Sequence, residues 1–331
     1  MRSYHLSKSG DGVDGLSVRD HERPIPGPGE VAVAVRAASI GFREALVLRG
    51  AYVLPVKPDG IPVAEGAGDV VAVGPGVDAV RAGDRVAATV FPTWQDGPWG
   101  LEHLPQRGGS LDGMLTEIAV VEEHGLVPIP EHLSYAEAAT LPCTAVTAWN
   151  ALTGVRAGQT VVTQGSGGVS LFTIQFAKAL GAKVIATTSS PAKAKRLTGL
   201  GADDVIDYRA TPDWPAQVRD LTGGRGADHI VDVTGLLGDS LRAVALGGQV
   251  ASVGFVSGTV PMLDPRALFA SGATVRPIAI GSRAQFQEMN RLIEAAGIHP
   301  VIDSQYPFDD ARDAFRRLLS GEALGKIVIT I

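Results

Sequence analysis

Three closely spaced glycines, Gly165, Gly167 and Gly168, are the residues of this sequence whose type and spacing most clearly point to chemistry. A β-branched run at 160–163 precedes them, and an apolar run at 171–180 follows. The first run is typical of a buried parallel strand and the second of a helix packed on a sheet. Glycines let a backbone approach a phosphate closely, and the helix expected to open near Gly168 points free amides at the anion.

A second β-branched run at 183–188 completes a strand–turn–helix–strand unit, which favours a dinucleotide pyrophosphate at the turn. Ser170 stands where the third glycine of G-x-G-x-x-G is usual, and a Gly-rich turn can also simply reverse the chain. The residues predicted to hold the pyrophosphate are Gly165, Ser166, Gly167, Gly168 and Val169.

The end of the second strand predicts which nicotinamide cofactor binds. No acid that could hold a ribose 2′-hydroxyl lies between Val184 and Ser190. Instead Ser189 and Ser190 precede Pro191, a residue suited to the first position of a helix, and Lys193 falls in the first turn. Hydroxyls, a helix N-terminus and a lysine suit a phosphate monoester, so we predict NADPH over NADH. The alternative is that Lys193 is an ordinary solvated lysine.

Composition excludes several function classes. The chain has 331 residues, a net charge of −6 and no basic stripe, so no nucleic-acid partner is expected. No apolar run reaches membrane-spanning length, and the N-terminus lacks the apolar core of a signal peptide, so we expect a cytoplasmic protein with no membrane partner. The single cysteine, Cys143, excludes an intrachain disulfide and a multi-cysteine metal lobe.

The pattern along the chain predicts an α/β protein, a doubly wound parallel sheet combined with a β-rich substrate domain. Residues 1–130 carry short strands separated by proline and glycine, which indicates antiparallel structure. Residues 131–281 alternate strands and helices, which predicts a Rossmann-type nucleotide-binding domain. Residues 282–331 end in a β-branched strand, predicted to return to the first domain.

Together these features resemble the medium-chain dehydrogenase/reductase superfamily over essentially the whole chain. The motifs that carry the resemblance are PGPGEV at 26–31, PVAEGAGDVVAVGPGV at 62–77, AGDRV at 82–86, DGMLTE at 112–117, AATLPCTAVTAW at 138–149 and VIDYR at 205–209. The order of a GroES-like domain, a Rossmann domain and a C-terminal return is similar to that of zinc-free alcohol dehydrogenase-like proteins and quinone oxidoreductases. The resemblance implies an NADP(H)-dependent oxidoreductase.

The positions of the catalytic zinc ligands distinguish the subclass. In zinc-dependent members of the superfamily a Cys, a His and a second Cys hold the metal, and here these positions fall on Gly41, Ala64 and Cys143. One ligand cannot hold a catalytic zinc, which needs three from the protein. Glu44 and Glu65 leave a carboxylate-rich site conceivable, although two hard oxygens and a thiolate are a poor zinc set. We therefore predict no metal.

The resemblance also implies a substrate pocket that is more apolar than in its relatives. Quinone oxidoreductase-like members have Asn-Tyr-Arg-Asp where this chain has Gly41-Phe42-Arg43-Glu44. A long stretch at 91–113 carries aromatic residues and is predicted to be a lid or binding loop, unless its tryptophans simply cover a core edge. The predicted pocket residues are Gly41, Phe42, Ala64, Phe91, Trp94, Trp99 and Cys143.

Without zinc, the negative charge that hydride transfer builds on oxygen needs a hydrogen-bond donor, a proton from water or delocalisation in the substrate. The resemblance implies Arg43 and Thr147 as catalytic hydrogen-bond donors. Cys143 lies beside them, but a free cysteine is more often a small buried core residue than a catalyst. Arg43 can equally pair with Glu44 or Glu65 as scaffold. Further cofactor contacts implied by the resemblance are Tyr208, Thr234, Gly254, Phe255, Val256, Ile280 and, as a weaker pyrophosphate candidate, Lys326.

Three functions remain compatible with the sequence. The first is a zinc-independent, NADPH-dependent oxidoreductase that acts on an apolar carbonyl, quinone or enone. The second is an NADPH-binding protein with little turnover, a structural or sensing role known among relatives such as the lens zeta-crystallins. The third is a zinc-dependent alcohol dehydrogenase. In each case the partners expected are a small-molecule substrate and, through the strand predicted at 274–280, a second copy of the chain in a homodimer.

Overall fold

The computed structural model describes residues 1–259 and 262–331, and the chain forms two compact units. One unit comprises Met1–Val146 together with Gly281–Ile331, and the other comprises Thr147–Ile280. The first unit therefore extends past the boundary predicted at residue 130. The physical reason is that helix α2 (Tyr135–Ala138) packs on the strands of the first unit rather than on the parallel sheet.

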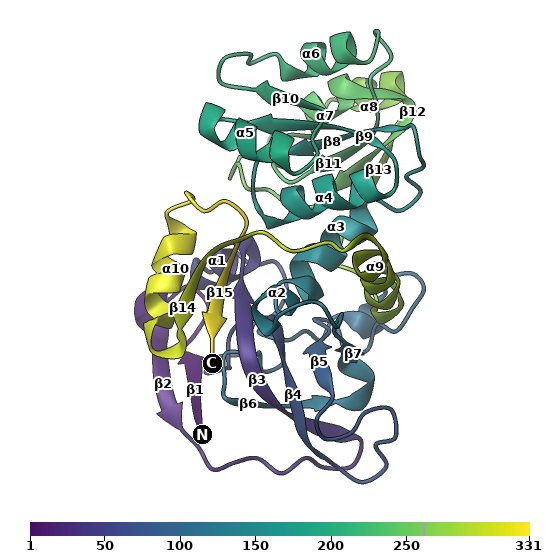
Figure 1. Ribbon diagram of the computed structural model, residues 1–331. Coiled ribbons are helices and arrows are strands. Elements are labelled where there is room, and N and C mark those ends of the chain that lie inside the picture. Colours follow the sequence, from purple (N-terminus) through teal and green to yellow (C-terminus); the bar gives the residue numbers. More distant parts are fainter. Residues whose placement is uncertain (260–261) are drawn as a thin grey trace. The chain divides into compact units, whose positions relative to one another are not determined.

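The second unit is built on a parallel sheet of six strands in the order β10-β9-β8-β11-β12-β13 (Figure 1). This order, with the first and fourth strands of the unit (β8 and β11) at its centre, is that of a doubly wound nucleotide-binding fold, so the predicted α/β class is confirmed. The strands are β8 (Thr160–Gln164), β9 (Lys183–Thr188), β10 (Asp204–Asp207), β11 (Ala227–Asp232), β12 (Val244–Ser252) and β13 (Thr274–Pro277).

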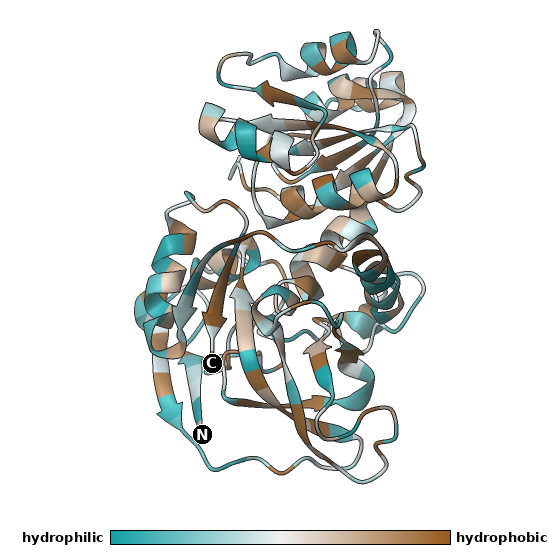
Figure 2. Cartoon of the chain, in the orientation of Figure 1, coloured by the Kyte–Doolittle hydropathy of each residue, from teal (hydrophilic) through white to brown (hydrophobic). Residues whose placement is uncertain are grey.

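Helices cover both faces of this sheet (Figure 1). Trp214 and Val218 of α6 and Leu241 of α7 pack into one buried cluster with Ile230 and Val250 of the sheet. Helix α4 lies on the other face, and the strands are mostly hydrophobic while α5 is mostly hydrophilic (Figure 2). The helices are α3 (Val146–Ala151), α4 (Gly168–Ala179), α5 (Pro191–Gly199), α6 (Trp214–Leu221), α7 (Leu237–Ala243) and α8 (Pro265–Ser271).

The first unit is β-rich, with a sheet in the order β14-β15-β3-β4-β5-β7 and β6 paired to β3. The pairs within β3, β4, β5, β6 and β7 are antiparallel. Its strands are β1 (Arg2–Leu6), β2 (Leu16–Asp20), β3 (Glu30–Ile40), β4 (Glu65–Val73), β5 (Arg85–Ala88), β6 (Ile118–Glu122), β7 (Leu126–Pro128), β14 (Ile302–Pro307) and β15 (Lys326–Thr330). Its other helices are α1 (Phe42–Leu48), α9 (Arg283–Ala296) and α10 (Ala311–Leu319).

The two ends of the chain share one core in the first unit. Strand β15 pairs antiparallel with β3, so residues near 328 lie beside residues near 39. Phe308 and Phe315 from the C-terminal segment pack with Tyr4 and Leu6 of β1, and burying each large side chain of this kind contributes about 1.5–3 kcal/mol. The C-terminal segment is thus part of the fold of the first unit.

Three elements differ from what the sequence pattern suggests. The hairpin of β1 and β2, and β14, lie in stretches too polar for a clear strand pattern, and pairing to neighbours stabilises them. Strand β13 ends at Pro277, before the predicted residue 280, because proline has no amide to donate and Ile280 adopts a φ of 57°. Within the described residues, the longest apolar helices are too short or too polar to span a bilayer.

Candidate functional site

The glycine turn of the second unit is shaped to admit an anion. Gly165 has a φ of 79°, a conformation that L side chains rarely adopt, and a Cβ built at Gly165 or Gly167 would meet nothing within 4 Å. Helix α4 begins at Gly168 behind Gly167, which has no side chain with which to cap it. The first amides of α4 therefore point into open space at the carboxyl end of β8, where a doubly wound sheet binds phosphates.

Ser170, the departure from the glycine pattern, is accommodated without disturbing this turn. Its side chain is 1% exposed, and its hydroxyl donates a hydrogen bond of 2.6 Å to the carbonyl of Gln164. The serine thus satisfies its own polar group against the end of β8. In G-x-G-x-x-G turns the third glycine lets the helix pack closely on the strand. Here Ser170 occupies that position, and its buried hydroxyl is hydrogen-bonded.

The predicted 2′-phosphate residues gather after β9. Strand β9 ends at Thr188 and α5 begins at Pro191, with Ser190 as its N-cap residue, yet the Ser190 hydroxyl makes no capping bond. Lys193 lies half-buried in the first turn of α5. Across residues 1–259 and 262–331, the hydroxyls of Ser189 and Ser190 and the Lys193 ammonium have no hydrogen-bond acceptor or ion-pair partner. These donors are thus available to a phosphate.

Tyr208 follows β10 at the same edge of the sheet. Its amide donates to the carbonyl of Thr188 at 3.0 Å, and its side chain is 41% exposed. The backbone of Tyr208 therefore lies beside the end of β9, and its contact with the cofactor stays a prediction.

A buried carboxylate that the sequence did not indicate shapes the turn after β11. Asp232 is 0% exposed, and its Oδ1 accepts hydrogen bonds from the amides of Thr234 and Gly235 at 2.8 and 2.9 Å and from the Thr234 hydroxyl at 2.9 Å. Its Oδ2 accepts from Ser240 at 2.8 Å. Asp232 thereby fixes Thr234, one of the predicted cofactor residues.

The loop after β12 packs against this turn. Val256 donates its amide to the carbonyl of Val233 at 3.1 Å, and Gly254 donates to Asp232 at 3.3 Å. Phe255 and Val256 remain 43% and 53% exposed. The predicted residues Gly254, Phe255 and Val256 thus lie together with Thr234 at the carboxyl ends of neighbouring strands, where ligands of open α/β sheets bind.

Ile280 is held in a strained backbone conformation. Its φ of 57° is unusual for a β-branched residue. Its carbonyl accepts a 2.7 Å hydrogen bond from Asn150 of α3, and Asn150 accepts one of 2.8 Å from Arg276. Thr147, one turn earlier in α3, is 6% exposed. Strain of this kind is concentrated at functional sites, and the carboxamide contact at Ile280 stays a prediction.

In the first unit, Arg43 is fully engaged. The guanidinium donates to the Tyr52 hydroxyl, Glu44 Oε1, the Gln106 side chain and two loop carbonyls, at distances of 2.7–3.2 Å. These contacts account for all five of its N–H groups. The structure therefore favours the scaffold alternative for Arg43 over a role as a proton donor.

Glu65 and Lys326 form a buried ion pair beside Cys143. The Lys326 ammonium lies 3.0 Å from Glu65 Oε2 and donates to the Thr144 hydroxyl at 2.8 Å, and both charged side chains are at most 3% exposed. The Thr144 hydroxyl in turn donates to Glu65 Oε1 at 2.7 Å. The Thr144 amide also donates to Glu65, in a π-helical turn (Leu141–Ala145) of the kind often found at functional sites. Lys326, predicted as a weaker pyrophosphate candidate, thus has its ammonium inside the first unit.

The chemistry of these residues does not fit a catalytic zinc. Gly41 and Ala64 offer no ligand atom. Cys143 is the single zinc-type ligand left at the three positions, and burial, followed by the nearby carboxylates of Glu65 and Glu44, raises the pKa of its thiol well above the ordinary value. Glu44 accepts the amide of Gly41 at 2.9 Å and the Arg43 guanidinium at 3.1 Å. In the described part of the chain, no group of three or more His, Cys, Asp or Glu side chains is arranged to hold a metal.

The predicted aromatic residues of the 91–113 stretch pack on one another. Phe91 and Trp94 are 3% and 5% exposed, and Trp99, at 40%, lies against both with ring centroids 5.9 and 6.4 Å apart. The backbone carbonyl of Trp94 accepts the amide of Arg283 at 2.9 Å, which ties the stretch to α9. Phe91 and Trp94 therefore cover a core edge, and Trp99 is the member of this cluster left to meet a ligand.

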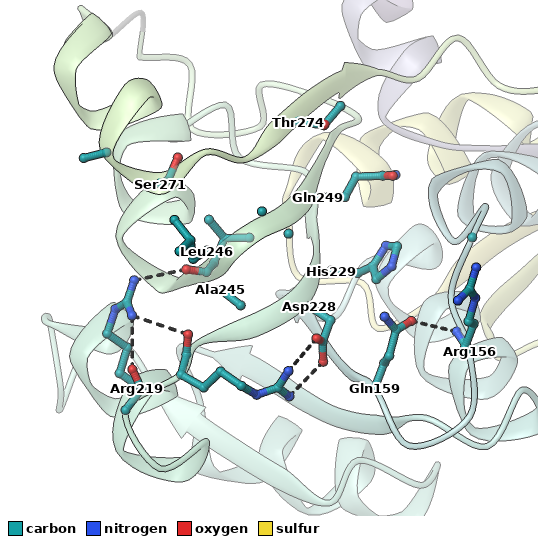
Figure 3. A pocket seen from close by; sticks show the side chains of 17 residues that line it. Arg156, Gln159, Arg219, Asp228, His229, Ala245, Leu246, Gln249, Ser271 and Thr274 are labelled. Atoms are coloured by element: carbon teal, nitrogen blue, oxygen red, sulfur yellow. Dashed lines mark hydrogen bonds and ion pairs between the residues drawn. The ribbon is translucent and has the colours of Figure 1, made fainter.

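A separate hollow of about 740 Å³ lies at the amino ends of the parallel strands (Figure 3). Arg219 donates there to the carbonyls of Arg242 and Val244 at 2.7 and 3.0 Å, and Arg225 forms an ion pair with Asp228 at 2.7 Å. These cations are already paired with the protein itself. The hollow lies at the amino ends of the strands, whereas the glycine turn lies at their carboxyl ends, where such sheets bind ligands. We therefore do not assign the cofactor to the hollow.

Comparison with known proteins agrees with this geometry. Residues 27–131 match the alcohol dehydrogenase GroES-like domain, and residues 168–295 match the zinc-binding dehydrogenase family. A zinc-type alcohol dehydrogenase-like protein of Schizosaccharomyces pombe is 38% identical over 97% of this chain and 96% of its own length. A quinone oxidoreductase of Pseudomonas aeruginosa is 31% identical over 96% of each chain. The crystal structure of an NAD-dependent alcohol dehydrogenase has a TM-score of 0.90, 34% identity and full coverage of both chains.

Proposed function

Because this chain belongs to the medium-chain dehydrogenase/reductase superfamily of NAD(P)-dependent oxidoreductases, we propose that it is a zinc-independent, NADPH-dependent reductase of apolar carbonyls, quinones or enones. The observation that carries the proposal is the donor set at the zinc-ligand positions. Two of the three positions, Gly41 and Ala64, have no ligand atom, and Cys143 alone cannot supply the three protein ligands that a catalytic zinc needs.

The preference for NADPH is supported by the residues after β9. At the start of α5, the donors of Ser189, Ser190 and Lys193 have no acceptor within the described part of the chain. The sequence from 183 to 190 contains no carboxylate that could hold a ribose diol. Hydrogen bonds from such groups to a phosphate are charge-assisted and contribute more than neutral ones. One of the similar structures is an NAD-dependent alcohol dehydrogenase. The affinities of this chain for NADPH and NADH must therefore be compared directly.

When bound, NADPH supplies a hydride to the acceptor carbon. The protein's part is to hold the pyrophosphate on the amides of α4, to fix Thr234 through Asp232, and to stabilise negative charge on the acceptor oxygen. Without a metal this stabilisation is weaker, so acceptors that delocalise charge are reduced faster. We therefore expect quinones and enones to be better acceptors than plain ketones.

We also propose a homodimer formed through β13. This strand is the last in the six-stranded sheet, so one of its edges has no strand partner within the described part of the second unit. Phe269 and Leu246 nearby are 90% and 83% exposed. Pairing of two such edges would satisfy the free backbone groups and cover apolar surface. A monomer in analytical ultracentrifugation at micromolar concentration would contradict it.

The second candidate function is an NADPH-binding protein with little turnover. It is favoured by one observation: Arg43, a predicted catalytic donor, has every N–H group engaged in scaffold contacts. On this view the protein binds NADPH tightly and reduces none of the acceptors.

The test is consumption of NADPH and of NADH by the purified protein with quinones, enones, aldehydes and ketones, with and without chelator. Metal content is measured on the same sample. We expect NADPH turnover that is insensitive to chelator and fastest with electron-poor acceptors. Turnover that chelator abolishes would return the protein to the zinc-dependent class, and tight binding without turnover would favour the second candidate.

A further inference from the structure

A row of polar side chains crosses the parallel sheet of the second unit near the amino ends of its strands. His229 of β11 is in register with Gln249 of β12, and Gln249 is in register with Thr274 of β13. Residues in register on neighbouring parallel strands point to the same face of a sheet, so these three side chains stand on one face. All three line the hollow of about 740 Å³ (Figure 3).

Two buried atoms of this row, Nδ1 of His229 and Nε2 of Gln249, have no hydrogen-bond partner in the described part of the chain. His229 as a whole is only 7% exposed. Burial lowers the pKa of its imidazole below the ordinary value, against the opposing charge of Asp228, so the ring is neutral at pH 7 with one donor and one acceptor nitrogen. Unpaired buried polar groups destabilise a fold, and Val161, in register with His229 on β8, is apolar. The two polar side chains therefore point to a ligand that completes their hydrogen bonds.

The hollow is also electropositive, although the chain carries a net charge of −6. Its charged lining consists of Arg156, Arg219, Arg225 and Asp228. Arg225 and Asp228 pair with each other at 2.7 Å, and Arg219 donates to neutral carbonyls. Among the residues that the structure describes, Arg156 and Arg219 have no carboxylate partner. Figure 3 shows these two arginines on opposite sides of the hollow, so positive charge is available at both.

We propose that this hollow is a second ligand site, which binds a small organic polyanion with carboxylate or phosphate groups and with hydroxyl or carbonyl groups between them. The oxyanions bind at Arg156 and Arg219, because guanidinium groups form charge-assisted hydrogen bonds with carboxylates and phosphates. The intervening polar groups complete the hydrogen bonds of His229 and Gln249. The volume is within the roughly 300–1,000 Å³ of ligand pockets. The site lies wholly within the second unit, at the opposite ends of the strands from the glycine turn, so this inference is independent of the proposed reductase function.

The test is isothermal titration calorimetry of the purified full-length protein with two probes, citrate for carboxylates and fructose 1,6-bisphosphate for phosphates. We expect at least one probe to bind at one site per chain with a Kd below about 1 mM, and the tighter probe identifies the oxyanion. Arg156→Gln is expected to weaken this binding about tenfold, because a charge-assisted hydrogen bond is lost. The matched control is Arg266→Gln, which removes an exposed arginine of the same unit that does not line the hollow and should leave the Kd unchanged.

His229→Leu separates a ligand site from a purely structural role. Leucine removes the unpaired imidazole from a buried strand, so thermal melts without ligand should show a fold at least as stable as the wild type, while the Kd for the probe rises about fivefold. A probe that Arg156→Gln and His229→Leu bind as tightly as the wild type does overturns the inference, as does the absence of binding by either probe at millimolar concentration. Competition between the probe and NADPH for one site also overturns it, because the anion would then lie at the glycine turn.

Discussion

The two units handle charge in opposite ways. In the second unit, the glycine turn and the start of α5 carry backbone amides, two hydroxyls and an ammonium that have no acceptor among the described residues, at the carboxyl ends of the strands. In the first unit, the charges of Arg43, Glu65 and Lys326 are buried and closely paired. The difference indicates that the second unit can bind an anionic ligand. In the first unit, the buried charges of Arg43, Glu65 and Lys326 are already paired within the protein.

The largest effect is expected from breaking the pairing of the first unit. Glu65→Leu leaves the Lys326 ammonium buried without its carboxylate, and loss of one partner of a buried pair costs about 3–5 kcal/mol. Urea denaturation monitored by circular dichroism measures this loss. The double variant Glu65→Leu/Lys326→Met removes both charges and should recover most of the lost free energy of unfolding. If the single and double variants had the same free energy of unfolding, the loss of stability would come from altered packing and not from the unpaired charge.

The next largest effect concerns the open turn of the second unit. Gly167→Ala adds a methyl group where nothing lies within 4 Å and where φ is not positive, so the fold should tolerate it. The methyl group would occupy the approach of a phosphate, and we expect the Kd for NADPH to rise by about tenfold or more, or roughly 1.4 kcal/mol. Isothermal titration calorimetry measures the affinity. Gly199→Ala, also in open space but late in α5, is the control and should bind as wild type does.

A smaller effect separates the two cofactors. Lys193→Glu places a negative charge at the proposed 2′-phosphate position, and we expect NADPH affinity to fall about tenfold, since a hydrogen bond to a charged group is worth about 1.5–3 kcal/mol. NADH affinity should change little. Fluorescence titration with both cofactors measures the ratio, and the same substitution at the exposed Lys195 of α5 is the control. Unchanged NADPH affinity in Lys193→Glu would remove the 2′-phosphate assignment.

The smallest effect is a difference in acid stability. Although burial raises the pKa of Asp228, hydrogen bonds from Arg225 and the Thr160 amide outweigh it and hold the pKa below its ordinary value of 3.8. A carboxyl group with a depressed folded pKa stabilises the fold above its unfolded pKa, and this contribution is lost as pH falls through the folded value. Asp228→Asn should therefore lower stability at pH 7 and flatten its decline below pH 4. Thermal melts between pH 3 and 7 measure it, and an unchanged slope would contradict the assignment.

Much of the second unit could be predicted from the sequence, because its signals are local. The run of Lys183–Thr188 is a strand with the predicted bounds, and α4 begins at Gly168 as the glycine spacing indicates. Parallel strands buried on both faces are continuous apolar runs, and a phosphate turn needs glycines at fixed offsets. Asp232 escaped notice because an acid at the end of a strand has no distinctive neighbours until its turn folds around it.

The first unit was harder to predict, because its important contacts join distant residues. The aromatic stretch at 91–113 suggested a binding loop, but Phe91 and Trp94 are buried against their neighbours. Arg43 suggested a donor, but its acceptors include Gln106, 63 residues away. Composition identifies an aromatic or a cation, whereas burial and pairing decide whether that residue meets a ligand.

The sequence by itself determined the family, the order of its elements and the absence of ligand atoms at Gly41 and Ala64, because each of these depends on residue identity and local spacing. Only the tertiary structure decided that Lys326, 285 residues after Gly41, places its ammonium beside that glycine. The physical reason is that β15 returns to pair with β3, so the surroundings of Gly41 depend on a contact between two segments far apart in the sequence.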